Sequence, residues 1–309
     1  MACAASTAFT RVAYVTGVTY GVTPATPTFS VLRRNSGGLG TEKATQKISE
    51  INLDNRVRDE IELSQSVSGS YSADLSYGSF DDLIASGLRG SWATNVLTDG
   101  NVDPLLTFEE TIDNSDGTFA YSEFLGAVVD GMDFGFESMK PVSFKVDMMA
   151  QKETLRAAII TGATYTAANA NVIETGNVVA SLAVHGLSPV PSVKTLSLSI
   201  KNNYRKVEVL GSKFPTCFIP GERDITGNMI AYFKTNALFQ RVLDHGAGAI
   251  SFTFGSVTLK KYTVSIPDAV FLNGSRRLAG MNDEVMVTIP FRARGTATVA
   301  PVTITRAVA

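Results

Sequence analysis

Two short stretches of the chain decide its fold: Val67-Ser68-Gly69-Ser70-Tyr71-Ser72-Ala73 and Ile225-Thr226-Gly227-Asn228-Met229-Ile230-Ala231. Each alternates apolar with small or polar residues, and this period of two is typical of a strand with one buried face. Each stretch is followed by a segment whose apolar residues have helical spacing. The sequence therefore predicts the same local order twice, a strand and then a helix.

Both predicted helices are short and have recognisable ends. Ser79 is positioned to cap the first, and Asp81 and Asp82 suit the positive end of its dipole. Asn236 is positioned to cap the second, and Gly246 to end it. Helices of this length cannot form a bundle, so we expect each to cover one face of a sheet.

The matching order continues beyond the helices. The corresponding strand segments are 105–108 and 250–254, then 121–132 and 262–272, then 142–148 and 285–291. Period-two alternation with one polar face is the usual pattern of antiparallel sheets, so the fold class is predicted to be mainly β. We interpret the repeated order as duplication of one module. Chance similarity between short strands is the alternative.

The composition between and around the two halves differs from the rest. Residues 156–191 are rich in Ala, Thr, Asn and Gly, although the run from Val178 to Val184 could form a strand. Both ends of the chain are rich in small residues, so we expect arms that are mobile in the isolated chain. The predicted organisation is an N-terminal arm at 1–27, a first module at 28–155, a linker at 156–191, a second module at 192–295 and a C-terminal arm at 296–309.

Composition and charge exclude several classes of protein. Hydrophobic residues make up 44% and charged residues 18%, which excludes wholesale disorder. A net charge of −2 argues against a broad basic face that reads nucleic acid. No apolar run is long enough to span a membrane, and the start has no pattern of a secretory signal. Cys3 and Cys217 are far apart in sequence and are expected to be free thiols in a reducing cytoplasm.

The sequence offers little for catalysis or metal binding. Neither His185 nor His245 has Cys, Asp or Glu residues at zinc spacing, and His245 suits a helix C-terminus. The run from Asp113 to Gly117 lacks the last ligand of a calcium loop and is interpreted as a hairpin turn. Glu109-Glu110 is an acidic pair near a strand end without an evident partner. We therefore predict a protein that is not an enzyme, with no catalytic residue, cofactor or metal.

The chain resembles the major tail-tube proteins of siphovirus-type, long-tailed bacteriophages, over roughly residues 40 to 295. The resemblance rests on the order of several motifs. They are Ser49-Glu50-Ile51, Asn55-Arg56, Ser66-Val67-Ser68-Gly69, Leu75-Ser76-Tyr77-Gly78-Ser79-Phe80-Asp81-Asp82-Leu83, Phe124-Leu125-Gly126-Ala127-Val128-Val129-Asp130, Ile225-Thr226-Gly227 and Tyr262-Thr263-Val264-Ser265-Ile266-Pro267.

This resemblance implies two tandem β-sandwich modules, each flanked by one short helix. It also implies a structural virion protein that is made in the host bacterial cytoplasm and assembles into stacked rings. The rings would form the tube of a non-contractile tail, through which DNA passes without sequence-specific binding. Its partners would be itself, the tape measure, the tail terminator and the distal tail protein. Two modules per chain favour a ring of three with pseudo-sixfold symmetry, and a hexamer is the alternative.

Within that resemblance, one acidic segment is a candidate for the inner wall. Its acids would repel phosphate, while an ordinary solvated strand face is the alternative interpretation. The residues are Glu50, Asp54, Asp59, Glu60 and Glu62. The alternative function is a carbohydrate- or receptor-binding β-sandwich, such as an adhesin or a head decoration protein. It would need a cluster of exposed aromatic residues on one loop face, and the sequence shows none.

Overall fold

The computed structural model describes residues 4–17, 19–51, 53–54, 56–102, 104–175, 180–278 and 280–308. Strands make up 52% of the chain and the two α-helices of the described part are short, so the predicted mainly β class is confirmed. Cys3 and Val178 lie outside the described residues, whereas Cys217 is a free, exposed thiol.

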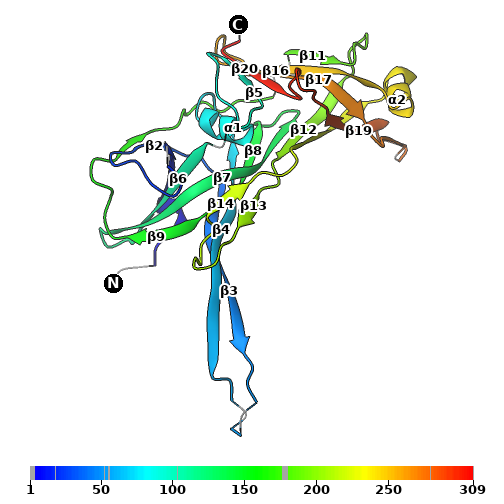
Figure 1. Cartoon of the computed structure of the whole chain (residues 1–309). Coiled ribbons are helices and arrows are strands. Elements are labelled where there is room, and N and C mark those ends of the chain that lie inside the picture. The colour runs from blue at the N-terminus through cyan, green and yellow to red at the C-terminus, as the bar shows by residue number, and fades with distance from the viewer. Residues whose placement is uncertain are drawn as a thin grey trace.

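One antiparallel sheet runs through the whole molecule (Figure 1). Its strand order is β3–β4–β8–β7–β12–β15–β19–β17–β16–β11. The strands are β3 (Ser36–Ile48), β4 (Asp59–Asp74), β7 (Phe119–Glu137), β8 (Ser143–Ala150), β11 (Ala180–Val184), β12 (Val193–Lys201), β15 (Asp224–Tyr232), β16 (Ala247–Phe254), β17 (Tyr262–Phe271) and β19 (Met286–Ala293). The pairing of β7 with β12 joins the two halves of the chain into this one sheet.

A smaller sheet packs against the first half of the large one. Its order is β10–β2–β1–β6–β7–β9, and the bounds are β1 (Thr10–Gly17), β2 (Thr28–Val31), β6 (Leu105–Asp113), β9 (Lys152–Arg156) and β10 (Thr164–Thr166). Phe108 of β6 stacks between Tyr14 of β1 and Tyr71 of β4, with ring centroids 5.6 Å apart in each pair. Because Tyr71 belongs to the large sheet, these rings form the interior of a β-sandwich.

Strand β7 belongs to both sheets. Its first part pairs with β6 and β9, and its second part, from Val128, pairs with β8 and β12. The strand changes sheets next to Gly126, which has φ +61°, a conformation that favours glycine. A Cβ atom there would also lie 2.9 Å from the ring of Tyr20. Gly126 therefore allows β7 to pair in both sheets.

The two halves place their strands in the same order. The first contributes β3–β4–β8–β7 and the second contributes β12–β15–β19–β17. The helix α1 (Asp81–Gly87) follows β4, and α2 (Asn236–Leu243) follows β15. The glycines of the two opening stretches hold matching positions, because Gly69 lies opposite Met148 and Gly227 lies opposite Phe291. Relative to these glycines, β4 pairs with β8 in the same register in which β15 pairs with β19.

Both helices are confirmed, but their predicted caps are wrong. The N-cap residues are Phe80 and Thr235, and neither makes a side-chain capping bond. The Ser79 hydroxyl instead accepts a hydrogen bond from the backbone N–H of Asn169, at 2.8 Å. Asn236 is the first helical residue rather than the cap. Ser79 is therefore used to hold a distant loop rather than to start the helix.

Parts of both terminal segments, for which mobile arms were expected, form paired strands. Strand β1 lies within residues 1–27, and β20 (Thr303–Arg306) lies within residues 296–309. Strand β20 pairs with both β17 and β5 (Val96–Thr98). Val12, Tyr14, Val302 and Ile304 belong to the hydrophobic cluster that spans both halves. The Thr- and Ala-rich composition concealed these short strands.

The remaining elements are small. They are η1 (Thr7–Phe9), β13 (Arg205–Val207), β14 (Cys217–Ile219) and β18 (Ser275–Arg277), with β13 and β14 forming a separate ribbon. The predicted linker supplies β10 and β11 to the two sheets. In the described part of the chain, no helix has the length and apolar character needed to cross a membrane.

The hairpin of β3 and β4 extends far beyond the rest of the molecule (Figure 1). Its pairing runs continuously from Ser36 opposite Ser72 to Ile48 opposite Asp59, with one bulge next to Thr45. Only the base of the hairpin, from Val67 onward, pairs with β8. The outer part is therefore a two-stranded arm, and near its root Glu62 and Gln65 contact Lys213 of the loop between β13 and β14.

Candidate functional site

The five acidic residues predicted to face a lumen all lie on the outer part of this hairpin. Glu50 and Asp54 are exposed in the turn, and Asp59, Glu60 and Glu62 lie at the start of β4. The structure brings them onto one arm. Glu60 and Glu62 are two residues apart in a strand, so they lie on the same face.

Basic side chains partly neutralise these acids. Asp54 forms an ion pair with Arg58 at 3.4 Å. Glu62 lies 3.2 Å from the Lys213 ammonium and 3.7 Å from that of Lys43. Hydrogen bonds from Gln65 and Lys213 lower the pKa of Glu62 below its ordinary value. The hairpin is therefore a mixed-charge surface rather than a uniformly negative one, with more acidic than basic residues in the turn and at the start of β4.

The hairpin also exposes large apolar side chains, which the sequence interpretation did not anticipate. Ile51 and Leu53 in the turn are fully exposed, and Ile61 and Leu63 in β4 are 39% and 48% exposed. Ile61 and Leu63 alternate with charged and polar residues, a pattern typical of a strand with one buried face, but both side chains are exposed in the single chain. A group of exposed apolar residues on a projecting arm is typical of a surface that another molecule covers.

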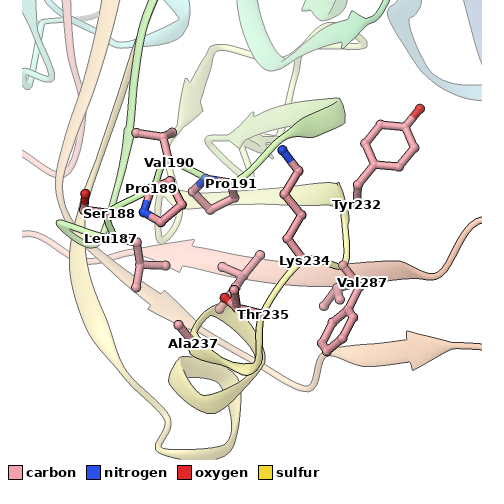
Figure 2. A pocket seen from close by; sticks show the side chains of 12 residues that line it. Leu187, Ser188, Pro189, Val190, Pro191, Tyr232, Lys234, Thr235, Ala237 and Val287 are labelled. Carbon is pink, nitrogen blue, oxygen red and sulfur yellow. The ribbon is translucent and has the colours of Figure 1, made fainter.

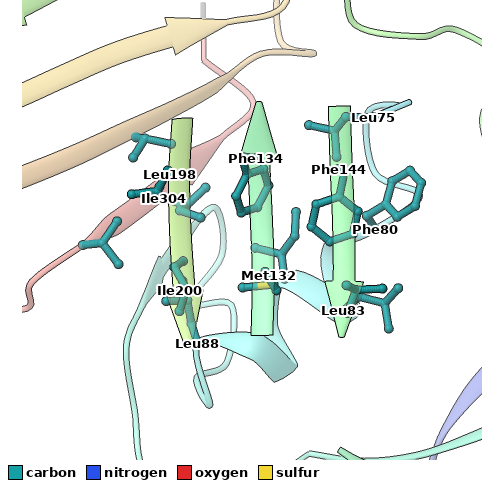
Figure 3. Packing of buried hydrophobic residues seen from close by; sticks show 14 of the residues in the cluster. Leu75, Phe80, Leu83, Leu88, Met132, Phe134, Phe144, Leu198, Ile200 and Ile304 are labelled. Carbon is teal, nitrogen blue, oxygen red and sulfur yellow. The ribbon is translucent and has the colours of Figure 1, made fainter. Parts of the chain in front are cut away.

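The two halves of the chain meet at a buried pairing of β7 with β12. Residues 131–137 of β7 pair with residues 195–201 of β12, and Phe134 lies opposite Leu198. Figure 3 shows Leu198 and Ile200 of β12 beside Met132 and Phe134 of β7, at the level of α1. The apolar alternation predicted the strands, but nothing in the sequence identified their partners.

Polar groups hold α1 beneath this junction. The carboxylate of Asp81 accepts a hydrogen bond from the Tyr262 hydroxyl at 2.6 Å and pairs with Arg306. The side chain of Asn202, at the end of β12, donates to the carbonyls of Gly87 and Val129 at 2.9 and 3.0 Å. The second half therefore covers the helix of the first half through charge as well as apolar contact.

The acidic residues at 109 and 110 have specific partners. Glu109 is buried, accepts a hydrogen bond from the Tyr165 hydroxyl at 2.6 Å and lies 3.5 Å from Arg11. Burial raises the pKa of Tyr165, and the hydrogen bond to Glu109 raises it further. Directly opposite Glu109 in the sheet, Glu123 pairs with Arg156 at 2.9 Å. These contacts fasten the segment after β9 to the smaller sheet, which is a structural role.

Neither histidine is arranged for catalysis. The ring of His185 is buried and stacks parallel to Phe271, with ring centroids 3.9 Å apart. Burial lowers the pKa of His185 below its ordinary value, so the ring favours its neutral form. His245 is exposed immediately after the C-cap of α2, at the position predicted for it.

Two further candidate sites are the turn between β6 and β7 and a pocket beside α2. Asp113 and Asp116 accept backbone hydrogen bonds from Ser115 and Thr118 in the turn between β6 and β7, which confirms the hairpin interpretation. Figure 2 shows a small pocket between Leu187–Pro191 and α2, with a volume of about 40 Å³. Across the described ranges, no three His, Cys, Asp or Glu side chains converge as metal ligands.

The comparison with known families decides the identity. The family model described as phage tail tube protein matches residues 7–293. This chain belongs to the phage tail tube protein family. No curated protein matches it. The match begins before β1 and reaches the end of β19, so it covers both halves of the tail tube protein as well as the junction between them.

Family membership establishes the general role. Tail tube proteins are structural, so this chain is a non-enzymatic component of the virion tail. It assembles with itself and with other tail proteins.

Proposed function

We propose that this tail tube protein carries a duplicated module, at 28–155 and 192–295, and that three copies close into a ring with pseudo-sixfold symmetry. The observation that carries this proposal is the identical strand order of the two halves within one sheet. Two equivalent units per chain supply six units from three chains. The ring then closes the open edges of the large sheet, which would otherwise promote uncontrolled aggregation.

Stacked rings of this kind form the tube of a non-contractile, siphovirus-type tail, which conducts DNA into the host. The large sheet, continued from copy to copy, forms the wall around the lumen. Glu50, Asp54, Asp59, Glu60 and Glu62 line the passage where the hairpin extends it. Their charge repels phosphate and prevents DNA from adhering, which supports passage without sequence-specific binding.

The projecting hairpin supplies the contact between successive rings. In the described part of the chain no third strand pairs with its outer part, and its exposed Ile51 and Leu53 gain burial when the tip inserts against the adjacent ring. The arm points away from the body along one direction (Figure 1), which gives the stack a polarity. The two ends of the tube therefore present different surfaces to the tail terminator and the distal tail protein, while the tape measure occupies the lumen.

Electron microscopy of the purified, concentrated protein tests this proposal. End-on class averages are expected to show a central hole and six lobes, and mass photometry is expected to give three chains per ring. Six chains per ring would contradict the trimer and favour the hexamer. Protein that stays monomeric even with preformed tail tips as initiators would contradict the tube-forming role.

A further inference from the structure

We infer that β18 of one copy pairs with β3 of the next copy, in the register that joins β7 to β12 within a chain. This inference rests on the proposed ring, and it names the edges and the residue pairs that close it. The partner is a second copy of this chain. The inference follows from comparing the two halves strand by strand.

Strands β17 and β18 together are the counterpart of β7 in the second half. Phe144 of β8 and Val287 of β19 each lie four residues before the position opposite the matching glycines Gly69 and Gly227. Phe134 of β7 lies opposite Phe144, and Arg276 of β18 lies opposite Val287. Arg276 therefore holds the place in the second half that Phe134 holds in the first.

Strand β3 is the counterpart of β12 in the first half. Leu198 of β12 lies opposite Gly227, and Leu39 of β3 lies opposite Gly69. Within the chain, Phe134 pairs with Leu198. Between copies, the corresponding pair is Arg276 with Leu39.

The neighbouring pair gives a precise contact for testing. Asp133 lies opposite Ser199 within the chain. The backbone N–H of Asn202 bonds to the carbonyl of Asp130, so even-numbered residues of β12 direct their backbone groups towards β7. Asp133 and Ser199 consequently form a non-hydrogen-bonded pair, with Cα atoms about 4.5 Å apart. The counterpart between copies is Ser275 with Gly40, at the same spacing.

Both edges are available and their charges are complementary. In the described part of the chain, β3 pairs only with β4, and β18 pairs only with β19. The side chains of Glu110 and Glu153 accept hydrogen bonds from the Leu39 N–H and the Thr41 hydroxyl at the β3 edge. Strand β18 supplies Arg276 and the adjacent Arg277, which are opposite in charge to these two carboxylates; the Arg34 guanidinium also donates to the Gly37 carbonyl at the β3 edge.

The contact of Glu110 with Leu39 must be exchanged when the edges pair. It is long, at 3.3 Å, whereas the Tyr71 hydroxyl donates to the same carboxylate oxygen at 2.7 Å. Glu110 therefore keeps a strong hydrogen bond after the Leu39 N–H has been transferred to a carbonyl of β18. The exchange leaves no buried carboxylate without a partner.

The different burial of the two helices also indicates that a neighbour is missing beside the second half. The second half covers α1, where Leu83 and Ile84 are almost completely buried. In α2 only Leu238 is buried, and Leu243 is 65% exposed. A next copy at the β18 edge would cover α2 as the second half covers α1.

Disulfide trapping in the full chain tests the register. Cys3 and Cys217 are first replaced by serine, and Ser275→Cys is combined with Gly40→Cys. A side chain at position 40 meets no atom within 4 Å, so the substitution fits the isolated chain. Assembled protein oxidised with diamide is expected to yield covalent dimers and trimers on a non-reducing gel.

Matched variants control for folding and proximity. Asp133→Cys with Ser199→Cys is the equivalent pair within the chain and should form an internal disulfide in monomers. Ser275→Cys with Gly38→Cys is displaced by two residues and should cross-link roughly fivefold less. If Gly40→Cys unfolds the chain by circular dichroism, Arg277→Cys with Gly38→Cys tests the same register.

The outcomes separate this inference from the proposed function. Rings that cross-link through 275 and 40 support both. Rings that cross-link better through 275 and 38, or through neither pair, overturn the edge pairing and leave the ring standing. Protein that forms neither rings nor covalent oligomers at any concentration overturns both.

Discussion

At the scale of single residues, Glu62 shows how the acids of the hairpin are held. Its hydrogen bonds to Gln65 and Lys213 stabilise the charged carboxylate, and they lower its pKa. Because the pKa in the folded protein is depressed, this stabilisation is present above the ordinary pKa of glutamate. It is lost as the pH falls through the lower folded value.

We expect Lys213→Met to raise the pKa of Glu62 towards the ordinary glutamate value. The carboxyl carbon shift of labelled glutamate, followed by NMR between neutral and acidic pH, measures this change. Lys206→Met is the matched control, because Lys206 donates to Ser66 rather than to Glu62. An equal shift in both variants would show that Lys213 acts only through net charge.

Asn202 is the residue on which the buried junction depends most directly. Its amide donates to two carbonyls, and its oxygen accepts from Arg223 at 3.2 Å. Asn202→Ala leaves these buried groups without partners, so we expect it to lower the free energy of unfolding by about 2 to 3 kcal/mol. Urea denaturation measures the loss, with the exposed Asn171→Ala as control. Equal stability of the two variants would contradict this role.

At the scale of elements, the hairpin is the part whose removal should separate ring formation from stacking. Replacing residues 49–58 by an Asn-Gly turn keeps the pairing of β3 with β4 and removes the exposed tip. We expect the variant to fold and to form single rings that no longer stack, as seen by electron microscopy. Tubes of normal length would show that the tip is dispensable for stacking.

Strand positions were predictable where alternation was strict, as in 142–148 and 285–291, which correspond to β8 and β19. Strands β1 and β20 were missed, because their apolar residues stand among Thr and Ala and resemble a flexible tail. The acidic residues of the hairpin are neighbours in sequence, whereas the basic partner of Glu62, Lys213, lies far away in sequence. The partner of β7 could not be predicted, because many alternating strands can pair with one another and only the packed core selects among them.

At the scale of the whole molecule, the two halves share one hydrophobic core. Phe136 of the first half contacts Phe252 and Phe254 of the second, each with ring centroids 5.0 Å apart. Strand β20 also joins β17 to β5 across the junction. The halves therefore depend on each other for folding even though their strand orders match.

We expect neither half to fold when it is produced alone. A fragment of residues 1–191 loses the neighbour of β7, and a fragment of residues 192–309 exposes the apolar face of β12. NMR spectra of the separate fragments should have poor dispersion, and mixing them should restore the dispersion of the intact chain. A cooperative thermal transition in either fragment alone would contradict this dependence.

The hydrogen bond between Glu110 and the edge of β3 has a kinetic consequence. A neighbour can add to this edge only after the carboxylate has moved aside, so the first contact between two free chains is an activated event. Once a ring exists, it holds the following chains in place while the exchange occurs, and growth is faster than initiation. Tube formation should therefore show a lag that shortens when preformed rings are added as seeds. A dilute pool of subunits would then persist in the infected cell until a nucleus is supplied.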